Sequence, residues 1–509
     1  MRLGNITPGT VGEGAWSGTK AVGSALVKPV TEAWSKGNYI EAVTRASVEI
    51  LSLPWALFKA GKVSEAAKAA KALKSVGRSE TVAHAGEGVH IKPKGAPHGS
   101  AEDVKAGKTS DSGKNCEPGK CTNKGEPVDV ATGDYLQIWP VLEIPGSLPL
   151  KLSRLYRSRA HFRGLFGYKW VDDWSQHLVL TPTGITFHGA DGTTLDYDAP
   201  DEDVLAHNRR NGRYLLSGRR SALLRLYDRT TGQTLCFAPG PKNSPVPKDR
   251  RLLSRIEDGN GNTIQFYYSA QGQLRRIEHS DGYELTLNLT SGGQLLDVTL
   301  HDGEQNPRRL LNCRYEKLGI SVSECASHQF GTLYHAYNDN SHMTEWYDTD
   351  QTHAYITYDA QGRVLRTATD SGHYSDRFEY HDANRCTDYH DAEGGSSRFY
   401  YNADFLVVRE VDALGHEWLT EWDEQTNKVA STDPLGRTTT YRYSDFGELL
   451  TQINPDGSRH AFDYNAQGRL SRYVAADGAT WQMAYDARGN IDAVKDPAWI
   501  PKVAFASRA

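Results

Sequence analysis

One short pattern recurs at an almost constant interval between residues 337 and 494, and it constrains the fold more than any other feature. Each copy begins with an aromatic residue and continues through a small polar or acidic residue to a glycine or its substitute. The complete copies are marked by Tyr358 and Gly362, Tyr443 and Gly447, Tyr464 and Gly468, and Tyr485 and Gly489. The degenerate copies begin at Tyr337, Tyr380, Tyr401 and Trp422. Successive copies start 21 residues apart, with a single step of 22, so the architecture is expected to repeat with this period.

Each unit contains two turns. A second marker keeps the same 21-residue interval and is followed each time by a nearby glycine: Asp370, Asp391, Asp412, Asp433 and Asn454. Between the turns lie runs of six to eight residues with alternating character, in which His460, Phe462 and Tyr464, for example, share one face. Glycine and asparagine supply the positive φ that tight turns require. One unit therefore predicts strand, tight turn, strand, tight turn, and the series predicts one long antiparallel sheet.

Two other repeat architectures fit the sequence less well. A helical solenoid needs apolar residues three to four positions apart and few glycines, whereas β-branched and aromatic residues dominate here and turns interrupt every run. A propeller blade needs about 40 residues, so two units would make one blade. No difference separates odd copies from even ones, which favours a continuous sheet.

Charge is distributed unevenly along the 509 residues, a length that suggests roughly two to four domains. Residues 1–128 contain 18 Lys+Arg and 12 Asp+Glu, whereas the remaining chain contains 40 and 51. An acidic sheet region without a basic stripe argues against nucleic-acid binding. No apolar run is long enough to span a bilayer, so we expect no transmembrane segment.

The first 124 residues differ in character from the rest. Residues 1–82 predict a small helical region, with one helix starting at Asn38 and a second running from Ser64 to Gly77. These helices are either a docking hairpin that a partner covers or a small packed pair. The Gly-, Pro- and Lys-rich residues 83–124 predict a flexible linker. The N-terminus lacks the apolar segment of a secretory signal peptide.

The chain lacks the residue patterns that carry common chemistry. Asp258–Asn262 matches the start of a calcium-binding loop, but a strand follows it and the twelfth position is Ser269, so we interpret it as a turn. Asp172 and Asp173 are adjacent in a strand-like segment and should point to opposite faces. We find no phosphate-binding loop, nucleophile motif or metal-ligand spacing. The sequence therefore predicts a protein that is not an enzyme, with no catalytic residue, metal or cofactor.

A second specific stretch lies between residues 125 and 180. Its first segment, residues 125–135, contains a proline, an acidic residue and a Thr-Gly turn, and its second, residues 164–174, is rich in glycine and tryptophan. We single out as structural residues Pro127, Asp129, Thr132, Gly133, Gly164, Leu165, Gly167, Trp170 and Trp174.

These segments and the Tyr-Asp-x-x-Gly copies together resemble the Rhs, or YD-repeat, family over roughly residues 120–495. The resemblance implies a β-sheet that spirals into a hollow shell around a C-terminal toxin, delivered between competing bacteria and often exported by type VI secretion. It implies that the N-terminal helices meet a secretion spike protein or a chaperone. We accordingly expect an Rhs β-domain at residues 125–250, a YD-repeat sheet at 251–495 and a short tail at 496–509.

Both ends depart from the family pattern. No spike-tip module is recognisable before Gly125, and Asp496-Pro497 lacks the glycine of the family's Asp-Pro-x-Gly boundary. We therefore expect a truncated or split member whose toxin cargo is encoded separately or lost. Its last strand is expected to remain an unpaired edge.

Two functions remain open. The first is a shell or scaffold that carries a toxin, made in the bacterial cytoplasm and exported by a route independent of a signal peptide. The alternative is a cell-surface carbohydrate-binding protein, because exposed rows of Trp and Tyr suit stacking on sugars. The direction of one set of aromatic side chains distinguishes them: Phe399, Tyr401, Trp418, Trp422, Phe462, Tyr464 and Trp481. Burial or a concave position favours the scaffold, and a convex exposed row favours sugar binding.

Overall fold

The computed structural model describes residues 120–495, apart from residue 126 and the ranges 201–204, 241–245, 304–305, 317–318, 350–351 and 373–374. Almost all of this part of the chain is β-strand or tight turn, and a single 3₁₀ turn, η1 (Asp382–Asn384), is its only helical element. The mainly β prediction is confirmed. The predicted helices in residues 1–82, nearly all of the predicted linker and the tail at 496–509 lie outside the described residues.

Seven short strands, which we call the plug, come first. They are β1 (Asn123–Lys124), β2 (Val128–Asp129), β3 (Leu136–Ile144), β4 (Leu150–Arg157), β5 (Arg163–Gly164), β6 (Gly167–Tyr168) and β7 (Trp170–Asp172). Strands β3, β4 and β7 form a three-stranded antiparallel sheet, and the other four form two small pairs. The apolar residues Leu150, Leu152 and Leu155 of β4 are buried, so this small sheet is itself part of a core.

A closed ring of eight strands follows the plug. These strands are β8 (His177–Leu180), β9 (Gly184–His188), β10 (Thr194–Asp198), β11 (Ala206–Asn208), β12 (Asn211–Gly218), β13 (Leu224–Asp228), β14 (Thr234–Phe237) and β15 (Arg250–Glu257). The first half of β15 pairs with β8, whereas its second half pairs with β14 and β16. The long sheet therefore leaves the ring at β15.

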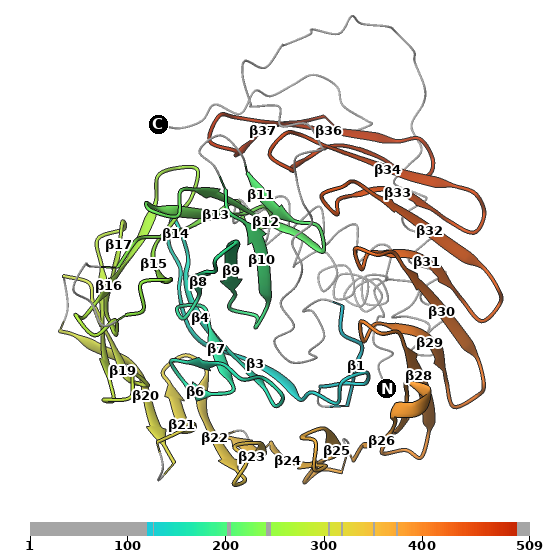
Figure 1. The fold of residues 1–509 in the computed structure, drawn as a ribbon, viewed down its shortest axis with the longest axis horizontal. Helices are drawn as coiled ribbons and strands as arrows, with labels where there is room; N and C mark the ends of the chain where they lie inside the picture. Colours follow the sequence, from blue (N-terminus) through green and yellow to red (C-terminus); the bar gives the residue numbers. More distant parts are fainter. Residues whose placement is uncertain are drawn as a thin grey trace, which may run out of the picture. The chain divides into compact units, whose positions relative to one another are not determined.

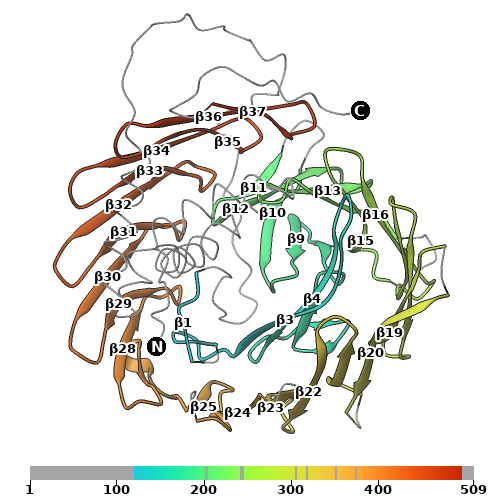
Figure 2. The same cartoon turned by 180° about the vertical axis from the view of Figure 1, so that it is seen from behind.

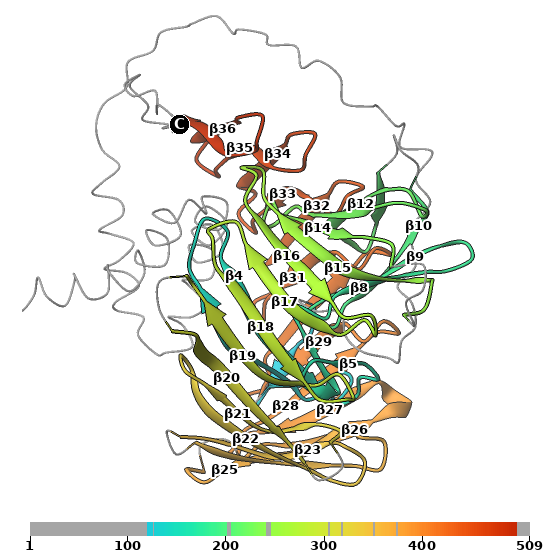
Figure 3. The same cartoon turned by 90° about the vertical axis from the view of Figure 1, so that its left-hand side faces the viewer.

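From β15 onward each strand pairs antiparallel with the next, so the predicted long sheet is confirmed (Figures 1 and 3). Its first strands are β16 (Thr263–Tyr268), β17 (Leu274–His279), β18 (Glu284–Leu289), β19 (Leu295–His301), β20 (Arg308–Tyr315), β21 (Val322–Ser327), β22 (Gly331–Tyr337), β23 (Met343–Asp348), β24 (His353–Tyr358), β25 (Val364–Thr369) and β26 (Arg377–His381). It continues through β27 (Cys386–His390), β28 (Ser396–Tyr401), β29 (Val407–Val411), β30 (Glu417–Trp422), β31 (Lys428–Thr432), β32 (Thr438–Tyr443), β33 (Leu449–Ile453), β34 (Arg459–Tyr464), β35 (Leu470–Val474), β36 (Thr480–Tyr485) and β37 (Ile491–Lys495).

The one step of 22 residues has a local structural cause. Tyr358 bonds to a backbone carbonyl 15 residues earlier, whereas Tyr380 bonds to Val364, 16 residues earlier. The additional residue therefore lies between Val364 and Tyr380, where the described ladder of β25 and β26 consists of Arg366 with Arg377. The register of the later repeats is preserved.

The plug packs on one face of the long sheet, and its strands β3 and β4 lie inside the curve of the sheet in both views (Figures 1 and 2). Backbone hydrogen bonds join the two parts, from Leu295 N to Leu165 O (2.8 Å), from Val322 N to Phe166 O (3.1 Å) and from Val364 N to Gly133 O (2.9 Å). Plug residues such as Trp170 share one hydrophobic core with sheet residues such as Phe399. The core of the described chain therefore lies between plug and sheet.

Turns of the last repeats return to turns of the first strands, while the ladder of β37 joins it to β36, so the expectation of an unpaired last edge stays a prediction. Polar contacts join turns and strand ends between β11 and β16 to turns of the later repeats. We call this line of contacts the seam. Its pairs are Arg210 with Asp404 (3.2 Å), Arg229 with Glu448, Arg469 with Tyr227 (2.8 Å) and Asn260 with Asn490 (2.7 and 3.1 Å). The curvature of successive twisted hairpins brings these distant turns together.

Candidate functional site

The repeat aromatics fasten each unit to the one before it. The hydroxyl of Tyr443 donates to the backbone carbonyl of Lys428 at 3.0 Å, across one hairpin. The same bond to a carbonyl 15 residues earlier is made by Tyr337, Tyr358, Tyr464, Tyr485 and, through its indole N–H, Trp422. Tyr401 instead packs beside Phe405, with ring centroids 5.8 Å apart. A large apolar ring with a polar tip suits this position because the ring is largely covered while the tip satisfies a backbone group.

The turn after each repeat aromatic needs a left-handed residue. Gly362, Gly447, Gly468 and Gly489 all have φ between 72° and 90°. The degenerate copies place Ser341, Phe405 and Thr426 there with φ of 57–64°, a costly conformation for these side chains. In a complete copy the Asp359 carboxylate accepts from the backbone N–H groups of Gln361 and Arg363 at 2.9 and 2.8 Å. The repeat aspartates are therefore turn formers in this structure.

The plug glycines lie where the backbone comes close to another segment. A Cβ added at Gly133 would lie 2.5 Å from the Arg363 side chain, and one at Gly167 would lie 2.3 Å from the Ile320 carbonyl. At Gly164 the obstacle is the Asp172 carboxylate at 2.5 Å. These glycines therefore let the plug reach the sheet and fold on itself.

The other signature residues of the plug form hydrogen bonds within the plug and to the sheet. Trp170 is fully buried and donates its indole N–H to the hydroxyl of Tyr337 at 3.1 Å, which joins the two sequence signatures directly. Leu165 O accepts from the Tyr315 hydroxyl (3.1 Å), and the Trp174 indole donates to Lys151 O (2.9 Å). Earlier in the plug, the backbone of Leu136 donates to Pro127 O at 3.0 Å.

Buried carboxylates in the plug serve local structure. Asp129 accepts hydrogen bonds from the backbone N–H and the hydroxyl of Thr132, while burial raises the pKa of Asp129 to about 6. Asp172 accepts from the backbone N–H of Leu165 at 2.8 Å, whereas Asp173 accepts from that of Ser153 at 2.6 Å. The two adjacent aspartates thus hold different segments, and they do not face a common site.

The aromatic row of the late repeats lies on the face of the sheet that the plug covers. Thr387 donates to Val130 O of the plug at 2.6 Å, and Glu410 forms an ion pair with Lys124 of the plug at 3.2 Å. The ladder pairs Thr387 with Phe399, Phe399 with Glu410 and Glu410 with Trp418, so these side chains share one face. By the same register the face also carries Tyr401, Trp422, Phe462, Tyr464 and Trp481.

Exposure changes along this row. Phe399 and Tyr401 are buried, whereas Trp418, Trp422, Phe462, Tyr464 and Trp481 are half-buried. Phe462, Tyr473 and Trp481 form a stacked series on three successive strands, with centroid separations of 5.1 and 5.2 Å. Beyond the plug contacts, the sheet therefore presents a partly open aromatic face.

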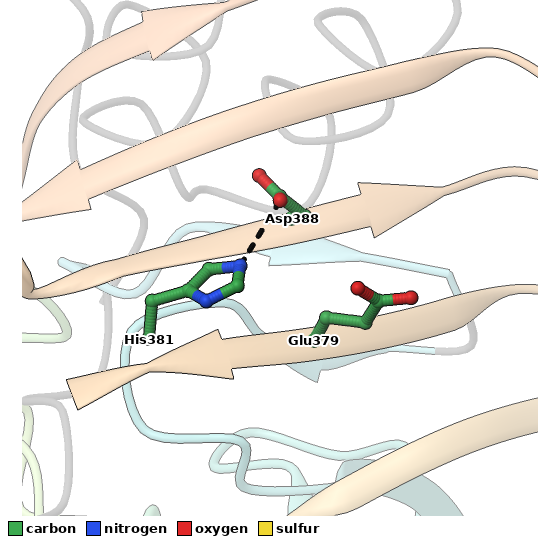
Figure 4. A group of neighbouring side chains, drawn as sticks. All are labelled: Glu379, His381 and Asp388. Carbon is green, nitrogen blue, oxygen red and sulfur yellow. Dashed lines mark hydrogen bonds and ion pairs between the residues drawn. The ribbon is translucent and has the colours of Figure 1, made fainter.

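One cluster has the composition of a metal site. Glu379 and His381 on β26 and Asp388 on β27 lie close together, with their ligand atoms within 4.8 Å of one another (Figure 4). The Arg398 guanidinium already binds the Asp388 carboxylate through two hydrogen bonds of 2.5 and 2.7 Å and lowers the pKa of Asp388. A metal ion would have to compete with this guanidinium. The geometry fits an ion-pair network on the face opposite the plug, and the absence of a metal stays a prediction.

Sequence patterns did not indicate the seam or the buried Arg154. The seam joins residues more than 190 positions apart whose individual turns look ordinary. Arg154 is 1% exposed within an otherwise regular strand. An arginine in the alternating apolar run Leu150–Tyr156 was the available signal. Among the described residues, no helix has the length and apolar character needed to cross a membrane.

Two family descriptions match the chain. The description "RHS Repeat" matches residues 422–459 and 464–498, and a domain of unknown function, DUF6531, matches residues 125–197. The second match covers both segments of the plug signature and continues into β10.

Relatives extend the similarity. The chain is 32% identical over 327 residues to the probable deoxyribonuclease RhsB of Dickeya dadantii (strain 3937), covering 63% of this chain and 22% of that protein. It is 26% identical over 300 residues to the double-stranded DNA deaminase toxin A of Burkholderia cenocepacia (strain H111), covering 55% and 20%. The matched part is thus about a fifth of these relatives. The crystal structure of TcdB2-TccC3-TEV has a TM-score of 0.34 and 12% identity, covering 70% of this chain and 22% of that chain. The repeats, the plug signature and the Rhs relatives place this chain in the Rhs, or YD-repeat, family.

Proposed function

We propose that the described region is the shell part of an Rhs-type toxin and that it performs no reaction itself. The observation that supports this proposal is that the signature residues all have structural roles. The repeat hydroxyls bond to backbone carbonyls, the turn carboxylates bond to backbone amides, and the plug glycines allow close packing. Two relatives named for different reactions, a deoxyribonuclease and a deaminase, match this same kind of region. A shared scaffold with a separate toxin accounts for that difference.

The partly open aromatic face is the surface we assign to the toxin cargo. It lies on the side of the sheet that the plug covers, and its stacked rings give apolar contact area without a fixed shape. This position supports a carrier more than the carbohydrate-binding alternative, which needs the row on an outward face. Export by a type VI machine, with the helices predicted in residues 1–82 meeting a spike protein or chaperone, is part of the proposal.

Limited proteolysis of the protein co-expressed with the toxin encoded at its locus tests the carrier function. We expect the toxin to co-purify and to resist protease. Replacing Phe462 and Trp481 by alanine should weaken that protection. The matched control is Arg472→Ala, because Arg472 lies on β35 facing away from this row. A toxin that is cleaved at the same rate with and without the chain would refute the carrier function, and glycan binding that these two substitutions abolish would favour the alternative.

A further inference from the structure

Two buried thiols face each other beneath the plug. Cys313 on β20 and Cys325 on β21 are direct partners in the antiparallel ladder, and their Sγ atoms lie 3.5 Å apart. Both residues are 3% exposed. Cys236 and Cys386 are also free and buried, but no second thiol is paired with either among the described residues. Directly opposed thiols are therefore a special feature of β20 and β21.

The same core contains the buried Arg154 cation, which forms no ion pair with a carboxylate among the described residues, although the buried Asp172 is its partner in the β4–β7 ladder. The Arg154 guanidinium lies over the rings of Trp170, Phe166 and Trp139, at 4.6, 5.2 and 5.6 Å from their centroids. Its Nη2 is 3.4 Å from His335 Nε2, while its Nε and Nη1 have no hydrogen-bond partner within the described chain. Aromatic faces offset part of the cost of burying a charge. A buried charge that lacks an anion remains expensive, so a nearby negative group would be strongly favoured.

The Arg154 charge also acts on the Cys325 thiol. The S–H of Cys313 donates to Cys325 Sγ, and this bond together with the Arg154 charge lowers the pKa of the Cys325 thiol against the effect of burial. Burial raises the pKa of Cys313, which stays protonated as the donor. The pair therefore offers one thiol whose pKa is lowered and a second thiol within reach, the arrangement that thiol–disulfide exchange uses.

We propose that Cys313 and Cys325 form a reversible disulfide across β20 and β21 when the chain meets a small-molecule disulfide such as oxidised glutathione. The Cys325 thiolate attacks one glutathione sulfur, so a mixed disulfide forms and one glutathione thiolate leaves. Cys313 then loses its proton to solvent and attacks Cys325 Sγ, which releases the second glutathione. Two protein thiols are oxidised and one glutathione disulfide is reduced to two thiols.

The geometry requires little adjustment once the reagent arrives. A disulfide bond is about 2.05 Å long, so the sulfur atoms must approach by about 1.5 Å. Because both thiols are buried, the reagent reaches them during a local opening of the β20–β21 hairpin or before the plug packs, and in the second case Arg154 does not act on the attack. The disulfide would then link β20 and β21, two neighbouring strands of the long sheet, covalently.

Peptide mapping of the full chain tests the proposal. The reduced, unfolded protein is refolded in a glutathione redox buffer, free thiols are alkylated, and non-reduced peptides are identified by mass spectrometry. A parallel sample of folded protein is incubated in the same buffer. We expect a Cys313–Cys325 crosslink in most molecules, kept in Cys236→Ser and Cys386→Ser and lost in Cys313→Ser. Cys121 forms a disulfide in the folded chain, so its peptide is mapped separately in both samples. Alkylated Cys313 and Cys325 in both samples, or crosslinks spread evenly over the free cysteines, would overturn the proposal.

Arg154 provides a second measurement. A stabilised thiolate favours the reduced pair, so removing the charge should favour the disulfide. We expect Arg154→Met to increase the equilibrium constant for oxidation by glutathione at least threefold at pH 8, and Arg154→Lys to keep it near the wild-type value. An unchanged constant in Arg154→Met would show that the guanidinium does not act on the thiols.

Discussion

The polar tip of each repeat aromatic has a task that its ring alone cannot perform. In Tyr443 the ring packs on the plug-facing side, and the hydroxyl satisfies the carbonyl of Lys428, the first residue of β31. Tyr441, two residues earlier on the same face, makes no side-chain hydrogen bond among the described residues and packs near the Lys428 ammonium at 5.1 Å. Two tyrosines of one strand thus separate the contribution of the ring from that of the hydroxyl.

We expect Tyr443→Phe to lower the free energy of unfolding by about 1 kcal/mol, because a half-buried carbonyl loses its donor. Tyr441→Phe should change it by less than about 0.5 kcal/mol, since no hydrogen bond is removed. Urea unfolding of both variants, followed by tryptophan fluorescence and circular dichroism, provides the comparison. Equal losses in the two variants would mean that the bond to the preceding unit contributes nothing.

The sequence predicted the positions of the repeat aromatics and turn glycines better than the groups that these residues contact. A period of 21 residues identified the aromatics and the turn glycines, because each position repeats a local backbone requirement. It did not predict that the hydroxyls bond 15 residues back, since alternation assigns a residue to a face and not to a neighbour. Phe405 and Thr426 show the same limit, because neither residue type indicates the left-handed backbone that the structure gives it.

At the scale of elements, the plug and the sheet meet through backbone rather than through side chains alone. Gly133 O accepts from Val364 N, so a loop of the plug bonds directly to the first residue of β25. Gly133 has φ of 70°, and Gly436, in a repeat turn, has φ of 74°. The surroundings differ, because a Cβ at Gly436 would meet no atom within 4 Å, whereas one at Gly133 would lie 2.7 Å from the Tyr380 hydroxyl.

These two glycines separate backbone strain from steric conflict. We expect Gly436→Ala to cost about 1 kcal/mol, from the left-handed conformation alone. Gly133→Ala should cost a further 1–3 kcal/mol or so, because the plug must move away from β25. Hydrogen exchange at the amide of Val364 should accelerate in Gly133→Ala and not in Gly436→Ala. Similar exchange in both variants would contradict the assignment of Gly133 to the plug–sheet contact.

At the scale of the whole described chain, the period predicted the sheet but not its return to the ring. Strand, turn and register follow from local alternation, and they repeat from β30 to β37 with little change. The seam depends instead on the twist and curvature summed over more than twenty strands, which no single unit encodes. Its residues are common turn formers such as Asn260 and Asn490, and nothing in their local sequence distinguishes them from turn residues outside the seam.

The seam predicts a specific crosslink. Asn260 and Asn490 exchange two amide hydrogen bonds, and the carbonyl of Arg488 lies against Gly259, so these turns are in direct contact. We expect a short bis-maleimide to join Asn260→Cys to Asn490→Cys in the folded protein within one molecule, giving an internally bridged peptide pair by mass spectrometry. The matched control pairs Asn260→Cys with Asn465→Cys, which lies in the corresponding turn one repeat earlier, and should crosslink far less. Because side-chain contacts rather than a strand ladder hold these turns, the yield should fall in mild urea before the circular dichroism of the sheet changes. Equal crosslinking yields in the two cysteine pairs would show that the turns of the last repeats do not contact those of the first strands.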